Sequence, residues 1–103
     1  MSDLQGEAFD RLHIEEVRCD SSSDIPILCE ILANCRQWSL GELSLGYDYS
    51  SQLITAANWS QLAAVCGAGK IDKVWVGKWN IQEGRREDLE AVKRITKDWI
   101  ERN

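Results

Sequence analysis

The chain has 103 residues, of which 44% are hydrophobic, and this length is enough for one small folded domain. Its formal net charge is −5 and its basic residues are scattered until the C-terminal segment, which disfavours nucleic-acid binding. No apolar stretch approaches the roughly 20 residues that a membrane span requires.

Three strands are predicted in chain order, because apolar and polar residues alternate with the period of two that is typical of a half-buried strand. The strands are expected near residues 10–15, 41–46 and 72–77.

Three helices are predicted between and after these strands. The first is expected over residues 25–36, and the second begins after Thr55, a candidate N-cap, and ends at Gly67. The third is expected over residues 86–103, with acidic residues at its start, basic residues later and Trp99 on its apolar side. The predicted element order therefore alternates strand and helix throughout.

One spacing of apolar residues recurs at 31-residue intervals, with apolar side chains at the first, fourth and sixth positions of each segment. The three segments are "FDRLHI" (9–14), "LGELSL" (40–45) and "IDKVWV" (71–76). A fixed period favours stacked βα units over a three-layer α/β domain, because stacking places equivalent residues in columns. We therefore predict an α/β fold, a single domain over residues 1–103 that forms a three-repeat βα solenoid with a parallel three-stranded sheet. The predicted repeats are about 9–39, 40–70 and 71–103.

These segments resemble the L-x-x-L-x-L core of the leucine-rich repeat family, and a helix in each unit resembles its ribonuclease-inhibitor-like class. The resemblance covers about residues 9–100. The family usually places Asn or Cys a few residues after the strand, where it hydrogen-bonds the turn. The matching positions here hold Val17, Asp48 and Trp79.

Side chains between the apolar positions are expected to point to the concave side of the sheet and to form columns across the repeats. The predicted columns are Arg11–Glu42–Lys73, His13–Ser44–Trp75 and Glu15–Gly46–Gly77. A large aromatic on such a face is a candidate interaction anchor, although the loop aromatics could instead cover the end of a small core. The candidate partner-binding residues are Arg11, His13, Glu42, Tyr47, Tyr49, Lys73, Trp75 and Trp79.

Catalytic, metal and cofactor chemistry has little support in the sequence. His13 is the only histidine, and no nucleophile elbow accompanies the conceivable Ser44–His13–Glu42 set. The segment "GAGK" (67–70) lacks the Ser or Thr of a phosphate loop and runs from a helix into a strand. We expect no catalytic residue, no cofactor and no metal.

The cysteines and the N-terminal residues indicate the compartment. The four cysteines form no C-x-x-C pair, and we expect reduced thiols that pack in the core, with Cys35 and Cys66 at equivalent positions of two repeats. Residues 1–8 are polar and acidic, unlike a signal peptide, so we expect a cytoplasmic protein.

The sequence therefore favours a non-enzymatic module that binds another protein through the concave strand face and the adjacent aromatic loops. A structural or assembly subunit that uses its exposed sheet edges, as a homodimer or in a larger complex, is the alternative. A small α/β enzyme is a lesser one.

Overall fold

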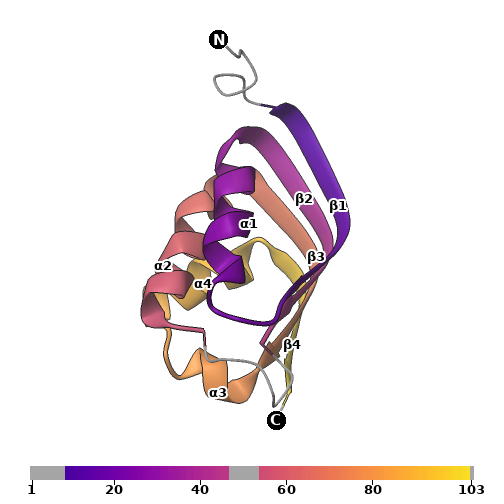
Figure 1. Ribbon diagram of the computed structural model, residues 1–103. Coiled ribbons are helices and arrows are strands. Elements are labelled where there is room, and N and C mark those ends of the chain that lie inside the picture. Colours follow the sequence, from indigo (N-terminus) through magenta and orange to yellow (C-terminus); the bar gives the residue numbers. More distant parts are fainter. Residues whose placement is uncertain (1–8, 47–53, 103) are drawn as a thin grey trace.

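The computed structural model describes residues 9–46 and 54–102, which form a parallel sheet with helices packed on one of its faces (Figure 1). The strands are β1 (Phe9–Cys19), β2 (Cys35–Leu45), β3 (Gly69–Gly77) and β4 (Thr96–Arg102), adjacent in that order. The helices are α1 (Asp24–Ala33), α2 (Ala56–Val65), α3 (Lys78–Ile81) and α4 (Arg86–Arg94), and the 3-10 turn η2 (Cys66–Ala68) follows α2. The predicted α/β class with a parallel sheet is confirmed, and the sheet has four strands rather than three.

The start of α2 follows the sequence prediction. Thr55 is its N-cap, and the backbone N–H of Asn58 donates to Thr55 Oγ1 at 3.2 Å. In return the backbone N–H of Thr55 donates to Asn58 Oδ1 at 3.1 Å, which completes a capping box. The first helix ends earlier than predicted, at Ala33, because Cys35 already belongs to β2.

The C-terminal part of the chain corrects the prediction of one long helix over residues 86–103. The helix α4 ends at Arg94, and β4 begins at Thr96, whose hydroxyl donates to the carbonyl of Val92 at 2.7 Å. Ile95 is the C-cap of α4, and Thr96, the first residue of β4, is β-branched and favours extended backbone. Trp99 lies in β4 and its ring centroid is 6.4 Å from that of Trp59 in α2, so it closes the core from the sheet side.

The register of the sheet confirms one set of predicted columns and corrects the other. Leu40, Leu43 and Leu45 of β2 pair with Ile71, Val74 and Val76 of β3, as the 31-residue spacing predicts. In β1, however, Ile14, Val17 and Cys19 occupy these positions, not Phe9, Leu12 and Ile14. The reason is unequal connections: residues 20–23 join β1 to α1, whereas residues 46–55 join β2 to α2.

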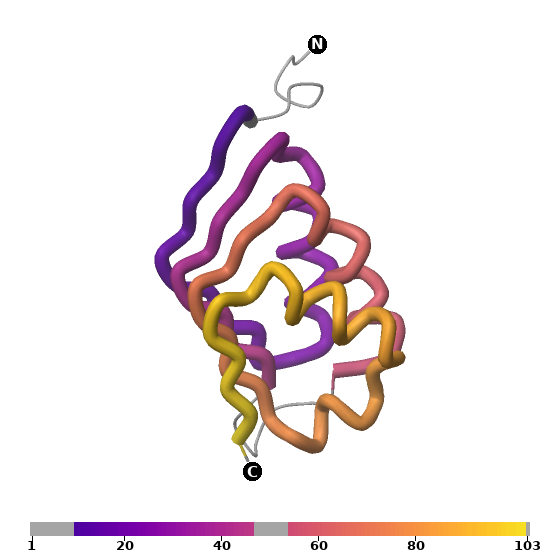
Figure 2. Tube along the Cα trace, turned by 180° about the vertical axis from the view of Figure 1, so that it is seen from behind, coloured from indigo at the N-terminus to yellow at the C-terminus, as the bar shows by residue number. Residues whose placement is uncertain are grey.

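The core lies between the sheet and the helices. Trp59 is fully buried, as predicted, and Trp38 is buried against the backbone of Gly69, with its indole N–H donating to the carbonyl of Val65 at 3.1 Å. The strands bend about halfway along their length (Figure 2). About halfway along β2, a Cβ on Gly41 would lie 2.5 Å from the carbonyl oxygen of Glu15, so only glycine fits there.

Candidate functional site: the open face of the sheet

All four helices lie on one face of the sheet, and the described chain leaves the other face uncovered (Figure 1). We call this second surface the open face. Two rows of side chains cross it from β1 to β4, because paired residues on neighbouring strands stand side by side. The rows are Glu16–Glu42–Lys73–Asp98 and Arg18–Ser44–Trp75–Ile100.

Trp75 is the largest side chain in these rows, and two cations hold its ring. The guanidinium carbon of Arg102 lies 5.0 Å from the ring centroid, and Lys73 Nζ lies 5.6 Å from it. Ile100 of β4 is its direct neighbour across the sheet. Trp75 is half-buried, so part of the ring lies against the molecule and part meets solvent. A fixed, partly exposed indole with cationic neighbours is the kind of group that anchors protein interfaces.

A cluster of acidic side chains lies near the bend of the strands. A shallow depression there is lined by five carboxylates and two lysines: Glu15, Glu16, Glu42, Asp72, Asp98, Lys73 and Lys97. Within residues 9–46 and 54–102, no group of three or more His, Cys, Asp or Glu side chains is placed to hold a metal ion. The lysines face these carboxylates, so the depression is a mixed-charge surface with excess negative charge.

His13 lies in a hydrogen-bonded set that the sequence analysis did not identify. His13 Nδ1 lies 2.6 Å from Ser39 Oγ, and His13 Nε2 lies 2.5 Å from Glu15 Oε1. The expected serine neighbour was Ser44, but the register pairs His13 with Ser39. The side chain of Glu15 is 87% exposed, so solvent weakens the electrostatic interaction between its carboxylate and the imidazole ring of His13. The set links β1 to β2 at the protein surface.

The first predicted column must also be corrected. Arg11 pairs with Gln37, whereas the β1 neighbour of Glu42 is Glu16. Arg11 and His13 therefore lie toward the amino ends of the strands, away from Trp75. Glu42, Lys73 and Trp75 do share the open face, as predicted. Tyr47 and Tyr49 lie outside the described residues.

Trp79 and Asn80 follow β3 and behave differently. Trp79 is half-buried, and its ring packs closely on Gly77 at the end of β3. A Cβ on Gly77 would lie 2.6 Å from this ring. Asn80 is fully buried: its amide nitrogen donates to the carbonyl of Gly46 at 2.6 Å, and its Oδ1 accepts the backbone N–H of Ile54 at 2.8 Å. Asn80 thus holds Gly46 and Ile54, the two described ends of the connection after β2.

The four cysteines are buried and unpaired thiols. Burial raises the pKa of Cys19 to about 12, and burial likewise raises the pKa of Cys29 and of Cys66 to about 11. Cys35 and Cys66 each donate to the carbonyl four residues earlier, on Ile31 and Leu62. The raised pKa keeps the thiols of Cys19, Cys29 and Cys66 protonated near neutral pH, and all four cysteines pack in the core, as predicted.

Comparisons with protein-family models, with curated proteins and with solved structures found no match for this chain. Among the described residues, no helix is both long enough and apolar enough to cross a membrane.

Proposed function

We propose that this chain is a non-enzymatic protein-interaction module whose open face binds a protein partner, with Trp75 as the central anchor. One observation carries the proposal: the helices cover a single face, so the opposite face presents a cross-strand surface with an aromatic ring between two cations. Aromatic and arginine side chains are enriched at the energetic centres of protein interfaces. Glu42 and Lys73 of the first row lie next to Trp75 and form the polar border of this binding surface.

The proposal includes a leucine-rich-repeat-like solenoid as the scaffold. The triplet of apolar residues at the first, fourth and sixth positions occurs on three consecutive strands once β1 is read from Ile14. The turn-binding role of Asn80 supports the same assignment. A cytoplasmic location belongs to the proposal as well, because free thiols persist in reducing compartments.

The test begins with selection of binders from a displayed library of protein fragments, using the whole chain as bait. A selected fragment is then titrated against the wild type, Trp75→Ala and Ile27→Ala. Ile27 is the matched control, because it is a large apolar side chain, 61% exposed, on α1 in the helical layer. We expect Trp75→Ala to weaken binding about tenfold or more and Ile27→Ala to leave it unchanged. Fragments whose affinity depends on Ile27 and not on Trp75 would contradict the proposal.

A second candidate function, assembly through the sheet edges, is favoured by a specific observation at the other end of the fold. Along the described chain, β1 and β4 each have one edge without a partner strand. Helix α1, which follows β1 in the chain, exposes Ile27 and Ile31, the latter at 44%. An assembly subunit would show a solution mass and a thermal midpoint that both fall on dilution, whereas the interaction module is expected to remain monomeric with a constant midpoint.

A further inference from the structure

Positive charge gathers at the amino ends of the strands, although the whole chain carries a net charge of −5. Two adjoining hollows lie there, and they share Gly69 and Lys70. Their lining contains five cations and one carboxylate. The cations are Arg11, Arg36, Lys70, Arg94 and Lys97, and the carboxylate is Asp72. We call the five cations the basic rim.

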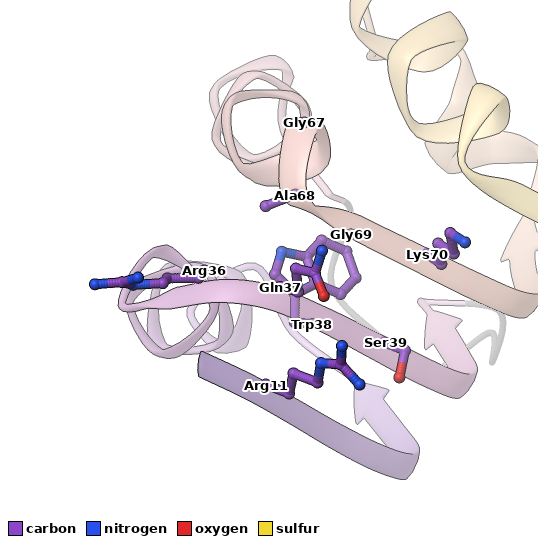
Figure 3. A pocket seen from close by; sticks show the side chains of 9 residues that line it. All are labelled: Arg11, Arg36, Gln37, Trp38, Ser39, Gly67, Ala68, Gly69 and Lys70. Atoms are coloured by element: carbon purple, nitrogen blue, oxygen red, sulfur yellow. The ribbon is translucent and has the colours of Figure 1, made fainter. Parts of the chain in front are cut away.

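The first hollow, of about 440 Å³, lies between the amino ends of β1, β2 and β3 (Figure 3). Arg11 rises from β1, Ser39 and Gln37 lie on β2, and Lys70 stands on the far side on β3. The turn at Gly67 forms the upper wall. The hollow thus offers two cations and two neutral hydrogen-bonding side chains around an open space wide enough for an acidic side chain.

Little within the described chain neutralises the basic rim. Arg36 has an ion pair with Asp10, at 3.7 Å, and in Figure 3 its side chain points away from the other labelled cations. No carboxylate of the described residues forms an ion pair with Arg11, Lys70 or Arg94. Like charges held together repel one another, so an anionic ligand would relieve this repulsion as well as gain its own contacts.

The charges next to the basic rim determine which class of anionic partner can bind there. The depression that carries Glu15 and Glu42 adjoins the basic rim, because Asp72 and Lys97 line both surfaces, and its carboxylates add to the negative net charge. A nucleic acid, with its regular row of phosphates, would meet this second surface and be repelled. A peptide can place carboxylates on the rim and its own basic or neutral residues over the bend. Arginine also matches a carboxylate with paired hydrogen bonds.

We infer that the basic rim binds the carboxylate side chains of an acidic segment in a protein partner. This inference rests on the proposed function and names the partner's chemistry: an acidic peptide segment at the amino ends of the strands, continuous with the surface that carries Trp75.

The test uses the full chain and a fluorescein-labelled short peptide of alternating Glu and Gly, followed by fluorescence anisotropy at low ionic strength. The rim variant is the double substitution Arg11→Gln and Lys70→Gln. Its control is the double substitution Lys78→Gln and Arg85→Gln, which removes the same charge from exposed sites on and near α3 and α4. All four side chains are exposed, so both variants are expected to fold, which circular dichroism checks.

We expect the rim variant to bind the peptide about tenfold more weakly than wild type, and the control to stay within about twofold. A peptide with Gln in place of Glu should not bind. Equal loss in both double variants, no binding by wild type, or stronger competition by inorganic phosphate or single-stranded DNA than by unlabelled peptide would each overturn the inference. The Trp75→Ala titration with a selected fragment is separate, so failure of the rim is distinguishable from failure of the open face.

Discussion

The buried amide of Asn80 should be worth a large share of the stability of this fold. Replacing Asn80 by Ala leaves two buried backbone groups without a partner, the carbonyl of Gly46 and the N–H of Ile54. Each such group costs about 1–3 kcal/mol when it stays buried and unsatisfied. The expected loss is therefore about 2–6 kcal/mol, against a total of about 5–15 kcal/mol for a typical domain.

Urea unfolding followed by tryptophan fluorescence measures this loss. With a slope of about 1–3 kcal/mol per molar urea, the midpoint of Asn80→Ala should fall by about 1–2 M or more. Asn34→Ala is the matched control, because its exposed side chain donates one hydrogen bond, to the carbonyl of Glu30 at 3.1 Å, and its loss should cost less than about 1 kcal/mol. A loss below about 0.5 kcal/mol for Asn80→Ala would refute the role assigned to this side chain.

Three further outcomes follow from the packing, the thiols and the surface hydrogen bonds. Gly69→Ala should lower the thermal midpoint strongly, because the added Cβ would lie 2.0 Å from the Trp38 ring. Gly67→Ala is the control and should have little effect, because the added Cβ would have no neighbour within 4 Å. Equal midpoints of the two variants would contradict this packing. The pKa of Cys19 is raised from 9.0 to about 12, so its thiol ionises in the unfolded chain at a lower pH than in the folded protein. The stability that the buried neutral thiol contributes is complete below pH 9 and falls between pH 9 and 12, by up to about 1.4 kcal/mol per pH unit. The urea midpoint of Cys19→Ala should therefore decline less steeply than that of wild type in this range, and parallel declines would contradict the raised pKa. Wild type and Ser39→Ala should hydrolyse an activated ester at the same rate, since the serine is a surface hydrogen-bonding group; a Ser39-dependent burst would revive the enzyme hypothesis.

The sequence predicted the centre of the sheet better than its edges. The pairing of Leu40 with Ile71 followed from equal spacing, because the chain between them forms one complete βα unit. The register of β1 was missed because the connection over residues 20–23 is shorter than the one over 46–55, and a period measured on one unit does not transfer to the other. The segment "IEEVRC" (14–19) carries the same apolar spacing and was the available signal.

The C-terminal strand and the turn-binding amide were missed for different reasons. Apolar residues at helical spacing continue from α4 through Trp99, so periodicity alone could not separate helix from strand there. Asn80 was missed because the repeat pattern pointed to Trp79, and only the three-dimensional path of the connection shows which side chain reaches Gly46. Of the candidate site, Glu42, Lys73 and Trp75 came together as predicted, because they lie on the two strands with the regular spacing.

Two-dimensional nitrogen–proton NMR of the five tryptophan indoles during titration with a selected partner fragment tests the central claim most directly. The indole resonances are assigned by single Trp→Phe variants. We predict that the Trp75 indole shifts on binding, while those of Trp38 and Trp59, which are buried and whose N–H groups donate to the carbonyls of Val65 and Asn80, stay in place. A saturated complex in which the Trp75 indole does not move would show that the partner binds elsewhere and would contradict the assignment of function to the open face.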